Sequence, residues 1–265
     1  MAKRKQANPR DDYYDRVQVS RDPAFLYVRP SSDSELDQIE LNLGAKVPHS
    51  YREFLKRFGS GVLEEWIQLC PILPAHDWKT SGTLVHNTLY TRSSSVLPQR
   101  QNPEWLASLV YFARDNAGGD YVWDPNAATQ QNQREYRFFY FQRLDNPIAA
   151  GGSFCEFLQW NASRMQRRGR NPDAVIPTVY KFTPNLLRRK KPPLKRDVNQ
   201  WLAFNNHTVR DLATSIRDEN RPDAFPILAD ALEEAGCTNA DLLESCRRGD
   251  PDIDGLWVLR VLLGQ

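Results

Sequence analysis

The feature that most constrains the fold is the stretch LVYFARDNAGGDYVWDP, from Leu109 to Pro125. Leu109 to Ala113 is an apolar run and Tyr121 to Trp123 is aromatic and β-branched, so each predicts a short strand. Between them, Asp115 to Gly119 has the residues of a turn that needs glycine. The stretch therefore predicts a β-hairpin, and it carries no motif of any reaction.

The composition is that of a folded chain without an export signal. With 265 residues, of which 40% are hydrophobic and 26% charged, the chain has enough apolar side chains for a core. The basic start, Met1 to Lys5, runs into polar residues, so we expect no secretory signal, no membrane span and a cytoplasmic protein. Four cysteines match no zinc or redox spacing and are expected to be free thiols: Cys70, Cys155, Cys237 and Cys246.

Residues 30 to 165 predict two helices, a sheet and a closing helix. Ser32 and Glu35 form a capping box before the first helix, and Ser153 and Glu156 form another before the last. Pro48 opens the second helix, in which apolar residues recur at helical spacing. Strands are predicted at Glu65 to Leu69, Leu109 to Ala113, Tyr121 to Trp123 and Tyr136 to Gln142, and the pattern admits one more at Thr83 to Thr91. We therefore expect an α+β domain, an antiparallel-rich sheet packed by helices.

The successive blocks of this region resemble the SUKH superfamily. The blocks are Leu43 to Leu55, Phe112 to Asp115, Gly118 to Tyr121 and Ser153 to Leu158. That superfamily contains bacterial toxin-immunity proteins and a fungal regulator of cell-wall synthesis. The resemblance implies a SUKH-like domain over residues 30–165 that binds a partner protein, a cognate toxin in the immunity proteins. It implies no shared catalytic residues, and it does not identify the partner.

The hairpin and the aromatic residues supply the candidates for partner binding. The aspartates at the hairpin either accept hydrogen bonds from a basic partner or stabilise the turn through their own backbone. The tryptophans and Tyr121 either form an interface or pack in the core, and the core is favoured for Trp66 and Trp123. The predicted set is Trp66, Trp78, Trp105, Asp115, Asp120, Tyr121 and Asp124.

No metal, cofactor or catalytic site is expected. The pair His76-Asp77 with His86 lacks a recognisable third zinc ligand. Asp250, Asp252 and Asp254 repeat the first half of a calcium loop, but the twelfth position is Val261. No serine lies in a nucleophile-elbow motif and no glycine pattern matches a phosphate loop. We therefore expect a protein that is not an enzyme.

The segment from Arg164 to Arg196 carries eleven Lys and Arg against one Asp, together with five prolines. Prolines break helical periodicity and stiffen the backbone, which favours a basic, proline-containing linker over residues 166–204. Two other interpretations stay open: neutralisation of nucleic-acid phosphates, and docking onto an acidic face of this chain or of a partner. The basic patch concerned is Arg188, Arg189, Lys190, Lys191, Lys195 and Arg196.

Residues 205–265 predict a small all-α bundle. Thr208 with Asp211 and Thr238 with Asp241 are placed to start helices. The region resembles a short helical tail found on diverse bacterial proteins. We thus expect an N-terminal extension (1–29), the SUKH-like domain, the linker and the bundle. The predicted function is stoichiometric protein binding, as an immunity or regulatory protein, and the alternative is a nucleic-acid-associated protein acting through residues 164–196.

Overall fold

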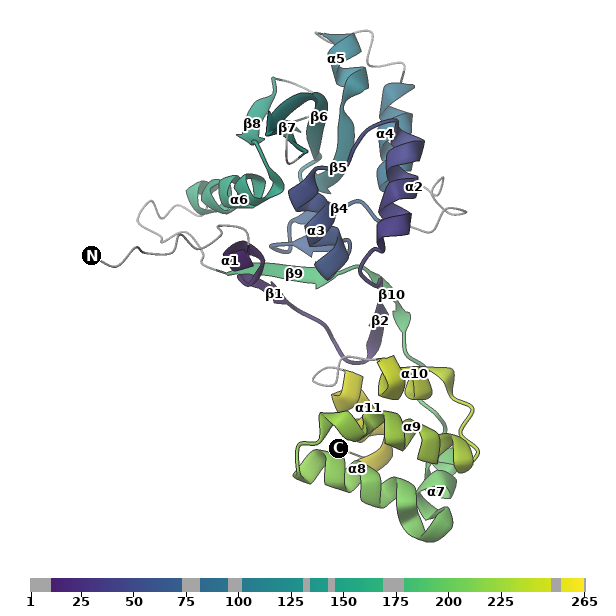
Figure 1. The fold of residues 1–265 in the computed structure, drawn as a ribbon. Helices are drawn as coiled ribbons and strands as arrows, with labels where there is room; N and C mark the ends of the chain where they lie inside the picture. The colour runs from purple at the N-terminus through teal and green to yellow at the C-terminus, as the bar shows by residue number, and fades with distance from the viewer. Residues whose placement is uncertain are drawn as a thin grey trace, which may run out of the picture. The chain divides into compact units, whose positions relative to one another are not determined.

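The computed structural model describes residues 11–72, 82–94, 102–130, 134–142, 146–168, 179–248 and 254–264 (Figure 1). The chain divides into two compact units. The first, which we call the sheet unit, comprises residues 1–20 and 28–185. The second, the helical unit, comprises residues 21–27 and 186–265. The mixture of a mostly antiparallel sheet with helices confirms the predicted α+β class.

Within the described residues, the sheet unit is built on one eight-stranded sheet. Neighbouring strands are antiparallel except for the parallel pair that β1 forms with β9. In spatial order the strands are β1 (Val17–Val19), β9 (Tyr180–Pro184), β3 (Gly61–Leu63), β4 (Ile67–Leu69), β5 (Val110–Asp115), β6 (Gly119–Gln130), β7 (Glu135–Gln142) and β8 (Ile148–Gly151).

The predicted hairpin is formed by β5 and β6 and places alternate residues on opposite faces of the sheet. Phe112 and Trp123 lie in the main core, while Tyr111 and Val122 lie in a second cluster on the other face. The turn needs glycine, because Gly118 has a φ of 80°. A Cβ on the next residue, Gly119, would lie 2.3 Å from the ring of Tyr140.

The helices of the sheet unit follow local capping rules. Ser32 and Glu35 form the predicted capping box, and Gly44 ends that helix with a φ of 63°. The strand considered at Thr83 to Thr91 is wrong, because Thr83 instead caps a helix by accepting a hydrogen bond from the His86 amide. The helices are α1 (Asp11–Tyr14), α2 (Asp33–Leu43), α3 (His49–Phe58), α4 (Leu84–Arg92), α5 (Pro103–Ser108) and α6 (Phe154–Arg168).

An aromatic core joins α3 and α6 to one face of the sheet. The ring of Tyr51 on α3 lies 4.6 Å from that of Phe154 on α6, centroid to centroid. Phe112 on β5 packs edge-on against Phe157 at 5.4 Å. Full burial of such a side chain contributes roughly 1.5–3 kcal/mol, so this cluster determines where the two helices lie.

The helical unit packs five helices around its own core in the part of the chain that the structure describes. They are α7 (Lys195–Ala203), α8 (Thr208–Asp218), α9 (Phe225–Glu234), α10 (Ala240–Arg248) and α11 (Asp254–Leu263), with short 3-10 turns at Asn205–His207 and Pro222–Ala224. A small two-stranded sheet of β2 (Phe25–Tyr27) and β10 (Leu186–Arg189) completes the unit.

Two predicted caps of this unit differ from the structure. The Thr208 hydroxyl donates to the Asn205 carbonyl at 2.6 Å and does not cap α8. Asn239, not Thr238, caps α10 by accepting from the Leu242 amide at 2.9 Å. Asp241, predicted to complete that cap, instead binds Arg188. Asparagine is preferred over threonine at helix N-caps, which agrees with Asn239 as the cap of α10.

The segment expected to be a linker is divided between the two units. Helix α6 extends to Arg168, β9 lies inside the sheet, and β10 and α7 belong to the helical unit. Residues 180–182 form a strand because buried and exposed side chains alternate along them. Tyr180 and Phe182 are buried on β9, while Lys181 between them is exposed. The N-terminal extension is divided in the same way, with α1 and β1 in the sheet unit and β2 in the helical unit.

Candidate functional site

A hollow of about 810 Å³ opens on the sheet unit between α1, α3, α6 and the adjoining ends of β6 and β7. We call it the groove. Its buried floor contains Tyr13, Tyr14, Ser50 and Glu135. Its walls and rim are Asp15, His49, Glu53, Lys56, Arg57, Gln130, Ser153, Cys155, Glu156 and Gln159.

Helical spacing explains why three side chains of α3 line the groove. His49, Glu53 and Lys56 share one face of α3, because they lie four and three residues apart. The opposite face of α3, with Tyr51 and Phe54, is buried in the core. The polar face of α3 therefore borders the groove, and the apolar face of the same helix anchors α3 to the sheet.

Ser50 is the residue at which the groove's elements meet. Its amide donates to Glu135 Oε1 and its hydroxyl donates to Glu135 Oε2, both at 2.8 Å. Its Oγ accepts from the Phe154 amide at 2.8 Å, and its carbonyl accepts from the hydroxyl of Tyr14. One serine thus links α3 to α1, β7 and α6.

The carboxylate of Glu135 serves as the cap of α3. Pro48, which precedes the helix, has no side chain that can accept a hydrogen bond. A negative charge at the exposed amides of a helix N-terminus is favourable, by roughly 0.3–1 kcal/mol and more when the charge is partly buried. Glu135 therefore holds the first turn of α3 against the start of β7.

The tyrosines of the floor are neutral hydrogen-bonding groups. The hydroxyls of Tyr13 and Tyr180 lie 2.5 Å apart, and the Cys155 thiol donates to Tyr14 Oη at 3.7 Å. Burial is the main cause that raises the pKa of both Tyr13 and Tyr14. Cys155 is only half-buried, whereas the other three cysteines are buried, and all four are free thiols as predicted.

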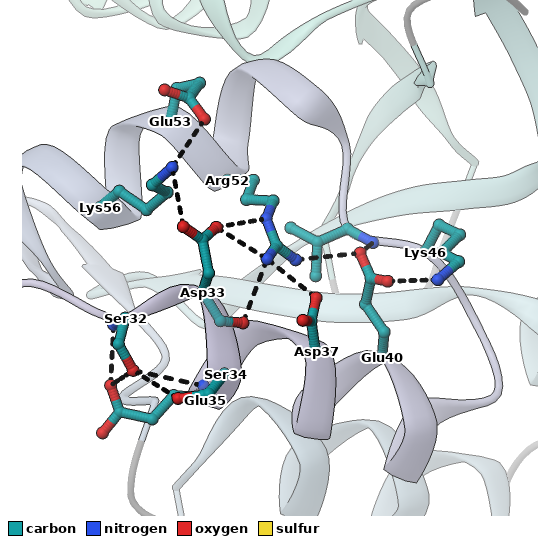
Figure 2. A network of polar contacts seen from close by, with 11 residues as sticks. Ser32, Asp33, Ser34, Glu35, Asp37, Glu40, Lys46, Arg52, Glu53 and Lys56 are labelled. Atoms are coloured by element: carbon teal, nitrogen blue, oxygen red, sulfur yellow. Dashed lines mark hydrogen bonds and ion pairs between the residues drawn. The ribbon is translucent and has the colours of Figure 1, made fainter.

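A network of ion pairs joins the groove to α2 (Figure 2). Arg52 on α3 contacts three acids of α2: Asp33 at 2.9 Å, Asp37 at 2.8 Å and Glu40 at 3.5 Å. Lys56 contacts Asp33 at 3.2 Å and the groove residue Glu53 at 3.5 Å. The three acids of α2 fall at positions i, i+4 and i+7, which places them on one face of the helix. The guanidinium of Arg52 can therefore contact all three.

The hairpin aspartates lie in the sheet unit's own hydrogen-bond network. Asp115 accepts from the amides of Ala117 and Gly119 and from the hydroxyl of Tyr121, at 3.0, 2.7 and 3.2 Å. Asp120 pairs with Arg114 at 2.9 Å, and burial raises its pKa although Arg114 opposes the shift. These contacts are those of turn-stabilising residues.

Asp124 and Trp105 are brought together on the face of the sheet that is opposite the main core. The Trp105 indole donates to Asp124 Oδ2 at 2.7 Å, and its ring packs edge-on against Phe139 at 5.4 Å. Tyr121 is fully buried, and Trp66 is half-buried against the main core. The seventh candidate, Trp78, lies outside the described residues, as do His76 and Asp77.

Two side chains of the basic patch, Arg188 and Lys190, are paired with acids of this chain. Arg188 forms two hydrogen bonds to Asp241, at 2.5 and 2.7 Å. The Lys190 side chain is 0% exposed, 2.5 Å from Asp254 and 4.7 Å from the centre of the Trp257 ring. The Lys191 amide donates to Asp241 at 2.8 Å. Docking onto acids within the chain is thus the interpretation that the geometry supports for Arg188 and Lys190, while Arg189, Lys191, Lys195 and Arg196 remain on the surface.

The considered metal sites lie only in part within the described residues. Asp254 of the half calcium loop is the partner of Lys190, and Asp250 and Asp252 lie outside the described residues. Elsewhere in the described ranges, no three His, Cys, Asp or Glu side chains are grouped so as to hold a metal ion. His86 stacks on Tyr90 of the same helix.

Sequence reasoning missed Ser50, Glu135 and Tyr14, the residues that organise the groove. Ser50 and Glu135 are 85 positions apart, and no local pattern relates them. Two signals were available: a helix opened by Pro48 without a side-chain cap, and a carboxylate at the head of the aromatic strand that begins at Glu135. Together they indicate an acid brought in from elsewhere to complete the helix.

Comparison with known proteins identifies a family for part of the sheet unit. Residues 30–160 match the SMI1 / KNR4 family (SUKH-1). No curated protein and no solved structure matches the chain. Among the described helices, none has the length and apolar character needed to cross a membrane. The matched range runs from α2 into α6 and includes β3 to β8, whereas α1, β1 and β9 lie outside it. Residues 30–160 therefore form a SUKH-1 domain, in agreement with the resemblance to the SUKH superfamily that the sequence predicts.

Proposed function

We propose that this chain acts without catalysis, by binding a partner protein stoichiometrically through the groove, as an immunity or regulatory protein. SUKH-1 membership supports an immunity or regulatory module. The observation that carries the proposal is the groove itself, about 810 Å³ in volume and assembled around Ser50 from four elements. A hollow of this size accepts a few side chains of a partner.

The floor of the groove is organised before any partner arrives. The polar atoms of Ser50 are engaged with Glu135, Phe154 and Tyr14. When the side chains of a site are already ordered, binding loses little side-chain entropy, and the affinity for the partner is correspondingly higher. This arrangement favours recognition of a folded or extended protein segment.

The same contacts argue for binding in preference to catalysis. Both oxygens of the buried Glu135 carboxylate accept hydrogen bonds from the start of α3. The raised pKa values of Tyr13 and Tyr14 keep both phenols protonated near neutral pH. A general base needs a pKa near the working pH, so neither phenol serves as one near neutral pH.

Nucleic-acid binding through residues 164–196 is not the function that the geometry favours. Phosphate contacts need accessible cations. Arg188 and Lys190 are committed to Asp241 and Asp254, and Lys190 has no exposed surface. The internal pair with Asp254 therefore removes Lys190 from any phosphate contact, and the cations left exposed for such contacts include Arg189, Lys191, Lys195 and Arg196.

Cys155 provides the test, because its thiol lines the groove and is the half-buried one of the four. A photo-crosslinker attached to Cys155 is used in an extract of the native host. The matched control is Cys155→Ser with Glu104→Cys, which places the same crosslinker on the exposed side of α5.

We expect one protein to be crosslinked from Cys155 and not from position 104. When both proteins are purified, they should form a 1:1 complex by light scattering, and mass spectrometry should show neither one chemically changed. Absence of a reconstituted complex, or conversion of the partner into a product, would contradict the proposal.

A further inference from the structure

We infer that the partner protein binds with an extended segment that pairs with the outer edge of β8 and continues into the groove. β8 is the last strand in the order of the described sheet, next to β7 (Figure 1). Among the described residues, no strand pairs with the outer edge of β8. The inference rests on the proposed function, because it specifies the form in which the partner meets the groove.

The backbone of an edge strand determines what can bind to it. Alternate N–H and C=O groups of such a strand point away from the sheet, and an added strand provides partners for them. A helix cannot do so, because its own backbone groups are already bonded internally. The edge of β8 is therefore suited to an extended segment, which it contacts through the main chain.

The edge at β8 lacks the charged side chains that commonly protect a sheet edge from further pairing. Asn146 to Ser153, all within the described residues, include no Lys, Arg, Asp or Glu. Ile148 is 51% exposed, and Ala149 beside it is also exposed. By contrast, β1 at the other edge has Arg16 directly before it and Arg21 two residues after it. Of these two edges, β8 is the one suited to receive a strand.

The end of β8 is fixed where the chain enters the rim of the groove. Gly151 has a φ of 136°, and a Cβ at this position would lie 2.8 Å from that of Glu156. The Gly152 amide donates to Glu156 Oε2 at 2.7 Å, and the Gly152 carbonyl accepts from the Thr129 hydroxyl. Ser153 and Glu156 both line the groove. Because β8 runs into this rim, a strand added beside β8 ends at the groove.

The edge and the groove supply different parts of one binding mode. β8 has only four residues, and its register against β7 shifts between Phe138 and Phe139, so the edge by itself supports a short pairing. The groove, about 810 Å³ in volume, has room for a few side chains. When a strand is added to a sheet, main-chain hydrogen bonds give affinity and neighbouring pockets give specificity. Both parts lie next to each other here.

The length of β8 also favours a partner segment over a second copy of this chain. Two copies paired only through their β8 strands would share about 13 Å of strand, since a strand rises roughly 3.3 Å per residue. Such a contact is small beside the roughly 1,200–2,000 Å² that stable interfaces bury. A partner segment that continues from the edge into the groove has more surface to contact.

Amide hydrogen exchange tests the pairing. The protein that crosslinks to Cys155 is purified and added to the full chain, and exchange of individual backbone amides is followed by NMR. We expect at least one amide of residues 148–151 to exchange about tenfold more slowly in the complex, because an outward-facing N–H then donates to the added strand. The amides of β1, at the other edge, serve as the control and should keep their exchange rates.

A pair of matched variants provides the second measurement. Ile148→Lys places a charge on the edge, and Leu41→Lys makes a similar change on α2 at a leucine that is 75% exposed. Thermal unfolding verifies that both variants are folded. We expect Ile148→Lys to bind the partner about tenfold more weakly, and Leu41→Lys to bind it within about twofold of the original chain.

The inference is overturned if the complex forms while the β8 amides keep their exchange rates, or if Ile148→Lys binds the partner as tightly as the original chain does. The proposed function stands in either case, because the partner still binds. Self-association of the free chain that Ile148→Lys abolishes would also overturn the inference, since a second copy would then pair with the edge. If no complex forms with any protein, the proposed function fails and the inference fails with it.

Discussion

The guanidinium of Arg164, on α6, donates a hydrogen bond to the hydroxyl of Tyr121, on β6, at 2.8 Å. The same group lies 3.6 Å from the centre of the Tyr140 ring and 3.6 Å from the carboxylate of Asp115. Arg164 thereby connects the last helix of the domain to the turn of the hairpin, which is distant from it in sequence.

The first prediction concerns this connection. Arg164→Met should lower the free energy of unfolding by about 3 kcal/mol, because it removes a cation that compensates a buried carboxylate and stacks on an aromatic ring. Urea denaturation measures the change. Arg196→Met, at a cation that is 84% exposed, should alter the free energy by less than about 0.5 kcal/mol. Equal effects of the two substitutions would show that the Arg164 contacts carry no net stability.

The second prediction concerns the link between Ser50 and Glu135. Glu135→Gln and Ser50→Ala should each destabilise the chain by about 1–3 kcal/mol, because each leaves a buried polar group without its partner. In a double-mutant cycle the two effects should be less than additive, since both remove the same hydrogen bond. Chemical denaturation of the four proteins gives the coupling, and strict additivity would contradict a direct interaction.

A third prediction follows from the pKa of Asp33. Arg52, followed by Lys56, holds the pKa of this carboxyl below its ordinary value. A depressed carboxyl pKa stabilises the folded chain above the unfolded-state pKa, and that contribution is lost as the pH falls through the folded-state value. Asp33→Asn should therefore lower the melting temperature at pH 7, and the difference from the original chain should shrink below about pH 3.8. A difference that persists unchanged in acid would exclude this linkage.

The fourth prediction concerns β9, which lies outside the matched family range. Phe182 is fully buried and packs edge-on against Phe54 at 5.3 Å. Phe182→Ala should cost about 3–5 kcal/mol, whereas Leu187→Ala, at an exposed position, should cost less than about 0.5 kcal/mol. For the same reason, a chain restricted to residues 30–160 should lose cooperative unfolding when followed by calorimetry. A stable 30–160 chain would show that β9 is dispensable.

The fifth prediction separates the structural role of the basic segment from nucleic-acid binding. Lys190→Met should destabilise the helical unit by about 3 kcal/mol, because Asp254 loses its buried partner. Adding Asp254→Asn should recover part of that loss. Unfolding of the variants is followed by circular dichroism, with Arg189→Met as the exposed control. A Lys190 variant that keeps full stability would contradict the buried ion pair.

Much of the local structure was predictable because its causes act over a few residues. The box formed by Ser32 and Glu35, the glycines of the hairpin and the helical spacing of Tyr51 and Phe54 each depend on neighbours within a turn or two. Predictions that depended on composition were less successful. The prolines and cations of residues 166–204 favoured a linker, although Tyr180 and Phe182 carried the alternation of a strand.

The sequence by itself determined the α+β class, the hairpin, the order of most elements and the SUKH resemblance, because capping, glycine geometry and hydrophobic periodicity are short-range effects. Tertiary structure alone decided the site. Ser50 meets Glu135 across 85 positions, and Lys190 meets Asp254 across 64. Such contacts form only after apolar surfaces have packed, since burial then requires each polar group to find a partner wherever the fold supplies one.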